Sequence, residues 1–198
     1  MAVNHSAYSE NKKQENILVL GDSLSGAYGI DREQGWVALL QRKLASQGYD
    51  YTVINASVSG DTTRTGLSRI DSALQNHQPE IVIIALGGND GLRGLPLSEI
   101  KTSLANIIEQ SQEQHARVLL AGVRLPPNYG AAYNTRFAAL YEELAKEYDI
   151  PLVPRILDQV ADDAALMQND GIHPTAEAQP RIMHNVWEKL VPLLESAQ

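Results

Sequence analysis

The 198-residue sequence contains no cysteine, and this absence excludes several kinds of chemistry at once. Disulfide bonds, thiol nucleophiles and thiolate metal sites all require cysteine, so none of them can occur in this chain. The sequence also lacks long hydrophobic runs: none approaches the roughly 20 apolar residues that cross a bilayer. We therefore expect no transmembrane segment.

Basic residues are outnumbered by acidic ones, with 16 Lys and Arg against 24 Asp and Glu, for a net charge of −8. Nucleic acids and anionic membranes are bound through basic patches, so this balance argues against both partners. We expect no nucleic-acid partner and no stable membrane anchoring. Hydrophobic residues make up 43% of the chain, which together with its length predicts one globular domain with a sizeable core.

The N-terminal stretch, residues 1–16, is polar and lacks the apolar segment of a signal peptide. We expect it to be either a flexible extension or a remnant joined where a signal was removed. Residues 17–198 are then the folded domain. If the chain is the complete product, the missing signal predicts a cytoplasmic protein.

From residue 17 onward, apolar runs that predict strands alternate with periodic patterns that predict helices. The clearest strand is 81–86, a continuous and largely β-branched run that is typical of the middle of a parallel sheet. The other strands are predicted at 17–20, 51–54, 118–121 and 152–153. This alternation predicts a doubly wound α/β fold: a three-layer α/β/α sandwich with a five-stranded parallel sheet in the flavodoxin-like order 2-1-3-4-5.

The predicted helices carry apolar residues at helical spacing. One helix is expected over 31–46, a second over about 62–76, and a third behind Ser98, which is a suitable N-cap. The last helix is expected to run to about Glu195 and to present Met183, Trp187, Leu190 and Leu194.

Polar, glycine-bearing loops follow several of these strands. Ser23 comes after the first strand, Gly60 after the second and Asn89 after the third, while Asp170 and His173 lie beyond the fifth. Because the carboxyl ends of parallel strands meet at one edge of the sheet, we expect these five residues to lie together.

Hydrolysis of an acyl bond needs a nucleophile, a base, a carboxylate that orients the base, and donors for the oxyanion. Ser23, His173 and Asp170, with Gly60 and Asn89 as donors, would supply that set. Each segment also has an ordinary structural interpretation. Gly-Asp-Ser and Asn-Asp-Gly are common turn sequences, and a His-Pro pair can begin a helix.

Other candidate motifs are weaker. Ser98 and Lys101 match the Ser-x-x-Lys pattern of β-lactamases, but the partner motifs are missing. The pair Asp162 and Asp163 lacks further ligands at metal spacing, and no phosphate loop or dinucleotide fingerprint occurs. We expect no metal site.

Four blocks together resemble the SGNH (GDSL) hydrolases. They are Gly21-Asp22-Ser23-Leu24-Ser25, Gly60 in the second loop, Gly87-Gly88-Asn89-Asp90, and Asp170-Gly171-Ile172-His173-Pro174. More narrowly, the segments 55–62, 88–94 and 124–130 look like those of the bacterial multifunctional thioesterase I/protease I/lysophospholipase L1 enzymes, a group that includes arylesterases. The resemblance extends from Ile17 to Leu194.

This resemblance implies an esterase that cleaves aryl esters, acyl-CoA thioesters or lysophospholipids without metal or cofactor. It implies that Ser23 is the nucleophile, that Asp170 and His173 complete the triad, and that Ser23, Gly60 and Asn89 form the oxyanion hole. It also implies an acyl pocket lined by Leu92, Leu95 and Pro127. Such enzymes are usually exported, so a periplasmic or secreted monomer is expected.

Two alternatives remain open at this point. The same blocks occur in carbohydrate O-acetyl esterases, which would act on acetylated sugars but not on longer acyl esters. A catalytically inactive binding module is the alternative from a different class, although the complete set of five site residues argues against it.

Overall fold

Five short strands form a fully parallel sheet in the computed structural model, which describes residues 15–195. Their order across the sheet is β2-β1-β3-β4-β5, as predicted, so β3 is central. The strands are β1 (Glu15–Gly21), β2 (Tyr51–Asn55), β3 (Ile81–Ala85), β4 (Arg117–Ala121) and β5 (Leu152–Val153).

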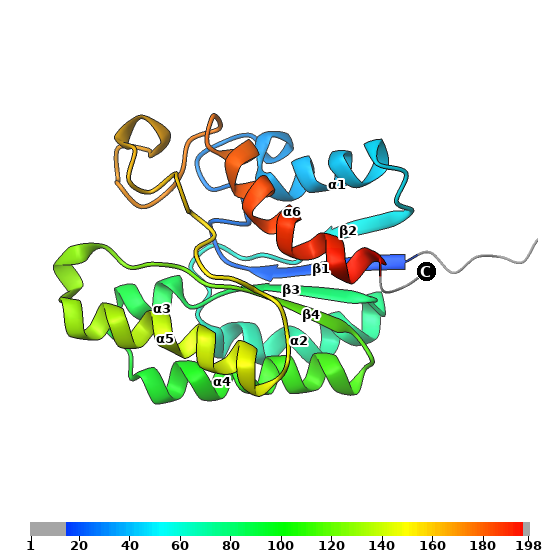
Figure 1. Ribbon diagram of the computed structural model, residues 1–198, viewed down its shortest axis with the longest axis horizontal. Coiled ribbons are helices and arrows are strands. Elements are labelled where there is room, and N and C mark those ends of the chain that lie inside the picture. Colours follow the sequence, from blue (N-terminus) through cyan, green and yellow to red (C-terminus); the bar gives the residue numbers. More distant parts are fainter. Residues whose placement is uncertain (1–14, 196–198) are drawn as a thin grey trace, which may run out of the picture.

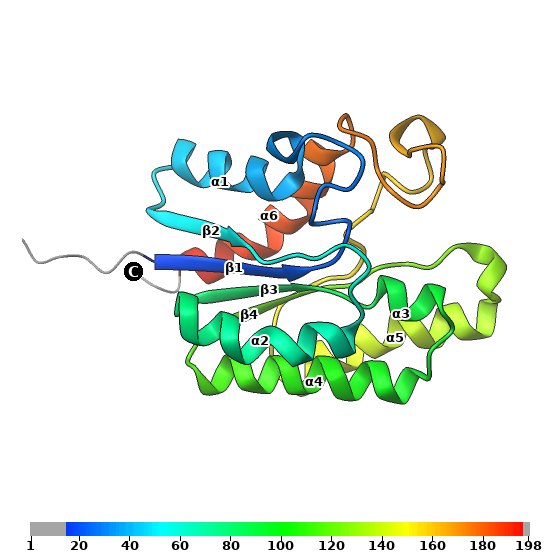
Figure 2. The same ribbon diagram turned by 180° about the vertical axis from the view of Figure 1, so that it is seen from behind.

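Helices cover both faces of this sheet (Figures 1 and 2). Helices α1 and α6 lie on one face, and α2, α4 and α5 lie on the other, while the short α3 follows β3. The helices are α1 (Trp36–Ser46), α2 (Thr63–His77), α3 (Gly88–Leu92), α4 (Leu97–Glu113), α5 (Ala131–Glu147) and α6 (Gln179–Glu195). Three 3₁₀ turns complete the described chain: η1 (Arg32–Gln34), η2 (Pro127–Tyr129) and η3 (Ala164–Leu166).

The strand sequences are continuously apolar because the sheet has a core on each face. In β1, Ile17 and Val19 belong to the cluster under α1 and α6, whereas Leu18 and Leu20 belong to the cluster under α2, α4 and α5. All four side chains have 0% exposure. Strand β3 alternates in the same way. A strand that is buried on both faces needs apolar residues at every position, and the continuous apolar run at 81–86 predicted this burial.

Several details differ from the sequence-based prediction. The helix expected over 31–46 is interrupted by Gly35, whose extended backbone (φ −64°, ψ 151°) separates η1 from α1. Helix α4 begins at Leu97 with Pro96 at the N-cap position, so Ser98 is not the N-cap. In α6 the buried stripe is Ile182, Val186, Leu190 and Leu194, which places Met183 and Trp187 at the margin of the core.

The predicted N-terminal extension lies outside the described residues except for residues 15 and 16, which belong to β1. Within residues 15–195, no helix combines the length and apolar character that spanning a membrane requires.

A glycine determines how closely the chain after β5 approaches β4. A Cβ on Gly122 would lie 2.7 Å from the carbonyl oxygen of Pro154, closer than such atoms approach each other. The two segments are also joined by backbone hydrogen bonds from Gly122 to Val153 and from Ile156 to Gly122, both 2.8 Å long. Gly122 therefore permits β4 to pack closely against the start of the segment that leads from β5 to Asp170 and His173.

Asp22 is a carboxyl group buried at the end of β1, with only 3% of the residue exposed. Burial raises its pKa from an ordinary value of 3.8 to about 6, and the nearby carboxylates of Asp90 and Asp61 add to this rise. The hydrogen bond from the backbone N–H of Leu24 and the imidazole of His173 oppose it. Since the folded state holds this proton more tightly than the unfolded chain does, the resulting stability is present below pH 3.8 and lost as the pH rises through 6.

We therefore predict a pH-dependent effect of Asp22→Asn on stability. An asparagine cannot ionise, so the free energy of unfolding of the variant minus that of the parent should rise from pH 4 to pH 7. A shift of about two pKa units corresponds to a rise on the order of 3 kcal/mol. Urea titrations at both pH values measure it, and Asp50→Asn controls for the loss of one exposed carboxylate. A difference that stays constant with pH would contradict the prediction.

Candidate active site

The turn that follows β1 presents Ser23 at the carboxyl edge of the sheet. Asp22 shapes this turn: its Oδ1 accepts a hydrogen bond from the N–H of Leu24 (3.1 Å), and its carbonyl accepts one from the N–H of Gly26 (2.9 Å). Gly21 is needed because a Cβ there would lie 2.7 Å from Ser25 Oγ. Ser25 itself is 1% exposed, so Ser23 is the accessible serine of the turn.

His173 lies against Ser23, although 150 residues separate them in the sequence. Its Nε2 is 2.9 Å from Ser23 Oγ, and its Nδ1 is 2.6 Å from Asp170 Oδ2. The structure thus brings together the three residues that the sequence analysis grouped as a nucleophile, a base and an orienting carboxylate.

Asp170 also organises the turn that carries His173. Its Oδ1 accepts hydrogen bonds from the backbone N–H groups of His173 (3.0 Å) and Ile172 (2.9 Å). These bonds and the contact with the imidazole lower its pKa to about 2, the N–H of His173 having the largest effect. An ionised carboxylate can only accept a hydrogen bond, so Nδ1 of His173 carries a proton and Nε2 is left to accept from Ser23.

The backbone N–H groups of Ser23 and Gly60 have no hydrogen-bond acceptor within the described part of the chain. Gly60 follows β2 and has a φ of +84°, in the region that glycine adopts without strain. Its carbonyl accepts a hydrogen bond from Arg93 Nη2 (3.2 Å). Backbone N–H groups without an acceptor are the kind of donor that can bind a developing oxyanion.

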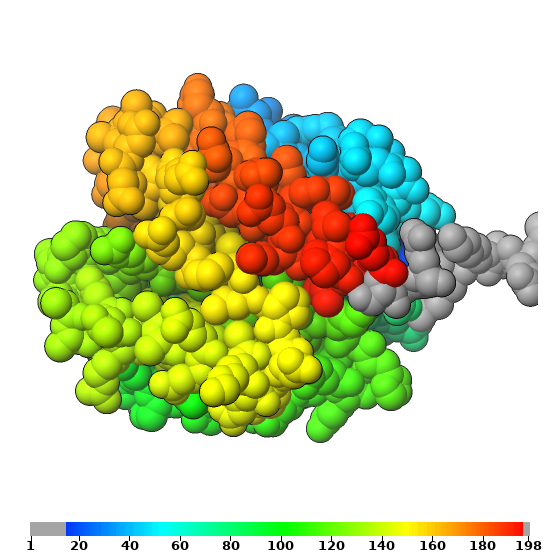
Figure 3. All heavy atoms as spheres, viewed as in Figure 1, coloured from blue at the N-terminus to red at the C-terminus, as the bar shows by residue number. Residues whose placement is uncertain are grey.

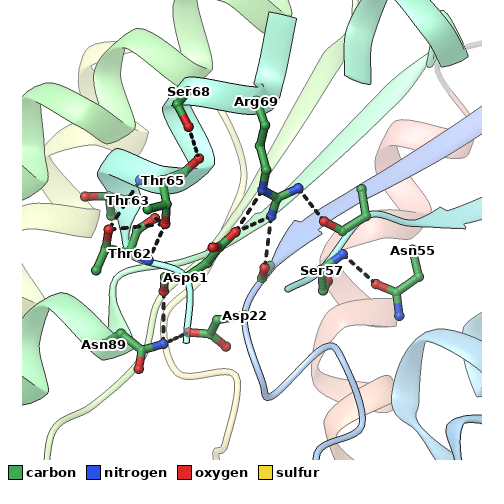
Figure 4. A network of polar contacts seen from close by, with 12 residues as sticks. Asp22, Asn55, Ser57, Asp61, Thr62, Thr63, Thr65, Ser68, Arg69 and Asn89 are labelled. Carbon is green, nitrogen blue, oxygen red and sulfur yellow. Dashed lines mark hydrogen bonds and ion pairs between the residues drawn. The ribbon is translucent and has the colours of Figure 1, made fainter. Parts of the chain in front are cut away.

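Asn89 lies at the start of α3, directly after β3, and is joined to the loop of Gly60. Its Nδ2 donates to the carbonyl of Asp61 (2.9 Å) and lies 3.4 Å from Asp22 Oδ2. Figure 4 shows the amide between these two residues. The predicted oxyanion donors therefore come from three neighbouring loops at one edge of the sheet.

Arg69 of α2 holds these loops together through several polar contacts (Figure 4). Its Nε and Nη2 bind Asp61 Oδ2 at 2.8 and 2.7 Å, and the same guanidinium donates to the carbonyls of Ala56 and Gly21. Both charged side chains are largely buried, at 26% and 12% exposure. A buried ion pair is favourable when further hydrogen bonds satisfy its remaining atoms, and the two carbonyls do so here.

A cavity of about 380 Å³ opens beside Ser23 and His173. One wall comes from the loops after β3 and β4, and the other from the segment between β5 and α6; Figure 3 shows these as separate green and orange lobes. Most of the lining side chains are apolar: Leu24, Leu92, Val123, Leu125, Pro126, Pro127, Leu157, Ala161, Met167 and Ile172.

Two of the three predicted pocket residues, Leu92 and Pro127, line this cavity, but Leu95 does not. Leu95 instead packs at the margin of the core under α4 and α5, and its carbonyl accepts a hydrogen bond from Tyr133 (2.9 Å). The prediction for Leu95 therefore needs correction. Leu92 packs against the same cluster and in addition lines the cavity; the turn at Gly94 (φ +64°) lies between the two residues.

The sequence analysis missed the second wall of the cavity. Leu157, Met167 and Ile172 lie in a segment with little regular structure, where periodicity carries no information. The available signal was the presence of apolar residues in a surface segment, since such residues usually need a partner. Tyr28, whose ring contacts that of His173, was likewise not predicted from the sequence.

Of the weaker candidates, Asp162 lines the cavity beside Ser23 and His173, without further ligands for a metal ion around it among residues 15–195. Ser98 is exposed at the start of α4, and Asp163 accepts a hydrogen bond from the N–H of Ala165 at the start of η3. Among residues 15–195, no group of three or more His, Cys, Asp or Glu side chains is arranged to hold a metal ion.

Residues 19–180 match the model of the GDSL-like Lipase/Acylhydrolase family. The chain is 48% identical to Esterase TesA of Pseudomonas aeruginosa over 180 residues, covering 91% of this chain and 90% of that protein. It is 43% identical to Thioesterase 1/protease 1/lysophospholipase L1 of Escherichia coli K12, covering 91% of this chain and 85% of that protein.

Solved structures agree with the sequence comparisons. The psychrotrophic esterase EstA from Pseudoalteromonas sp., inhibited by monoethylphosphonate, superimposes with a TM-score of 0.87 at 38% identity, covering 91% of this chain and 99% of that chain. Family match, sequence identity and shared fold all extend over the part of the chain that carries Ser23, Gly60, Asn89, Asp170 and His173. The protein belongs to the GDSL-like lipase/acylhydrolase family of SGNH hydrolases.

Proposed function

We propose that this protein hydrolyses carboxylic esters and thioesters through a covalent acyl-enzyme on Ser23. The observation that carries this proposal is the contact of His173 with both partners, at 2.9 Å from Ser23 Oγ and 2.6 Å from Asp170 Oδ2. The names of its relatives, an esterase and a thioesterase/lysophospholipase, support the same class of reaction.

In the first step, Nε2 of His173 takes the proton of the Ser23 hydroxyl as its oxygen attacks the acyl carbonyl carbon. Asp170, ionised because its pKa is about 2, holds the imidazole and stabilises the positive charge that it acquires. The protonated His173 then gives this proton to the departing alcohol or thiol. The acyl group remains as an ester of Ser23.

The negative charge of the tetrahedral intermediate is proposed to be bound by the N–H groups of Ser23 and Gly60 and by the amide of Asn89. Both hydrogens of the Asn89 amide already face acceptors, at 2.9 Å in Asp61 and 3.4 Å in Asp22. The shorter bond keeps the amide in place. The longer one is the weaker contact, and an oxyanion would replace it at little cost.

In the second step, water attacks the acyl-serine while His173 again accepts and returns a proton, and the carboxylic acid leaves. Every proton in this scheme moves between substrate, water and the two side chains of Ser23 and His173. The proposed mechanism therefore needs no metal and no cofactor.

The apolar lining of the cavity supports an acyl chain as the group that is bound, with aryl esters, acyl-CoA and lysophospholipids as the proposed substrates. A carbohydrate O-acetyl esterase is not favoured, because most of the side chains that line the cavity are apolar and cannot hydrogen-bond a sugar.

A monomeric and exported protein is also part of the proposal. All five proposed site residues come from one chain, so no second subunit is needed to complete the site. Export to the periplasm or medium rests on the family resemblance alone. Light scattering of the purified protein and cell fractionation test these two points.

We predict that Ser23 is the residue that becomes covalently modified. An organophosphonate should add one adduct to the peptide that contains Ser23, and hydrolysis should stop as the adduct forms. Ser23→Ala should be neither labelled nor active. Peptide mass spectrometry locates the adduct, and labelling of Ser25, Ser59 or Ser98 instead would refute the assignment.

For Asn89, the prediction separates an oxyanion donor from a residue that only shapes a turn. Asn89→Ala should lower kcat by ~10²–10³, because one donor to the transition state is lost, and should change KM little. Asn76→Ala, at an exposed position near the end of α2, is the control. The measurements are steady-state kinetics on a short aryl ester and a thermal melt. A kcat within a few-fold of the parent would remove Asn89 from the mechanism.

Leu92 and Leu95 form a matched pair for testing chain-length preference, because both pack at the margin of the same core cluster and only Leu92 lines the cavity. Leu92→Asn should lower kcat/KM for a decanoyl ester about 10-fold more than for an acetyl ester, since the longer chain loses an apolar contact. Leu95→Asn should affect the two esters equally. Equal losses in Leu92→Asn would instead indicate a packing role.

A further inference from the structure

Gln168 joins the two loops that carry Ser23 and His173. Its Nε2 donates to the carbonyl of Tyr28 (2.8 Å), 140 residues away, and to the carbonyl of Pro174 (2.9 Å). Both neighbours are carbonyl oxygens, which can only accept hydrogen bonds, so the amide nitrogen is the only end of this side chain that can face them. The side chain thus connects the loop after β1 with the segment before α6.

The backbone of Gln168 also holds the turn of His173. Its N–H donates to the carbonyl of His173 (2.7 Å), and its carbonyl accepts from the N–H of Gly171 (2.9 Å). Met167 and Pro174 form an antiparallel bridge around the same turn. Asp170 and His173 are therefore carried on a closed, hydrogen-bonded turn whose base is Gln168.

Tyr28 completes the connection from the side of Ser23. Its N–H donates to the carbonyl of Ser23 (3.2 Å), and its ring lies against the ring of His173, with 4.4 Å between the centroids and a tilt of 35°. Tyr28 is 51% exposed, whereas the side chain of His173 is only 16% exposed. An aromatic ring that is exposed on one side and covers an imidazole on the other restricts the movement of that imidazole.

These contacts form a closed circuit: Ser23 to Tyr28, Tyr28 to Gln168, Gln168 to His173, and His173 back to Ser23. We propose that Tyr28 and Gln168 are positioning residues that hold the imidazole of His173 against the hydroxyl of Ser23. This inference rests on the function proposed above. Neither residue lines the cavity, so neither is expected to contact the acyl chain. Because a displacement of about 1 Å can cost ~10²-fold in rate, a loosened circuit should slow the reaction more than it weakens binding.

The first test uses Tyr28→Leu beside Tyr28→Phe. The leucine removes the ring face, and the phenylalanine keeps it while removing a hydroxyl that has no hydrogen-bond partner in residues 15–195. Tyr28→Leu should lower both kcat and the rate of inactivation by an organophosphonate about 10-fold or more, with KM within a few-fold of the parent. Tyr28→Phe should recover most of this loss.

The second test uses Gln168→Glu, which keeps the shape of the side chain but replaces the donor with a carboxylate facing two carbonyls. The matched control is Gln112→Glu, whose amide also donates to a backbone carbonyl, that of Tyr148, at a distant site. Gln168→Glu should slow inactivation and turnover as Tyr28→Leu does, and the control should not. If Gln168→Glu does not fold, the neutral Gln168→Leu removes the same two hydrogen bonds.

The double variant Tyr28→Leu/Gln168→Glu shows whether the residues act through one geometry. We expect it to be little slower than the slower single variant, because residues of one circuit are not additive. Phosphonate inactivation at the parental rate in both single variants would overturn the inference, as would a loss that follows the melting temperature alone. A parent enzyme that is not labelled at Ser23 would instead contradict the proposed function.

Discussion

The site depends on the parallel pairing of β1 with β2 on one side and β3 on the other. The registers pair Leu18 with Ile54 and with Val82, so the three strands run together and end at nearly the same level. Burial of both faces fixes this alignment, because a shift of one residue would move each side chain to the opposite core. The loops that leave the three ends then carry Ser23, Gly60 and Asn89, and their proximity follows from the sheet itself.

Alignment of the strands brings the loops close together, and a polar network then determines their conformation. Arg69 contacts the end of β1, the chain after β2 and the side chain of Asp61, and Asp61 in turn accepts the amide of Asn89. A guanidinium is suited to this place because its donors lie in one rigid plane and stay charged at every relevant pH. The carboxyl group of Asp22, by contrast, accepts one hydrogen bond from a backbone N–H and has a 3.4 Å contact with the amide of Asn89. These contacts do not offset the effect of burial, which raises the pKa of Asp22.

Most of the fold was predictable because its signals are local. The buried run at 81–86 predicted the central strand, and the alternation of strands with helices predicted the layers and the strand order. The errors occurred where several local signals compete. The pattern of residues 31–46 continues through Gly35 although the helix does not, and Ser98 has the chemistry of an N-cap although the chain already enters α4 after Pro96. In α6, Trp187 and Met183 are apolar but lie beside the buried stripe rather than on it.

The sequence by itself determined the members of the proposed catalytic set. Ser23, Gly60 and Asn89 each come soon after the end of a strand, and Asp170 reaches His173 within one short turn, so local order and the parallel sheet suffice to group them. Only the tertiary structure decided what surrounds that set. Leu92 and Leu95 are alike in sequence and pack against the same core cluster, but only Leu92 also lines the cavity. The second wall of the cavity and the contact of Tyr28 with Gln168 involve residues that are far apart in the sequence and lie in irregular segments. Such segments have no repeating backbone geometry, so their contacts leave no periodic pattern in the sequence.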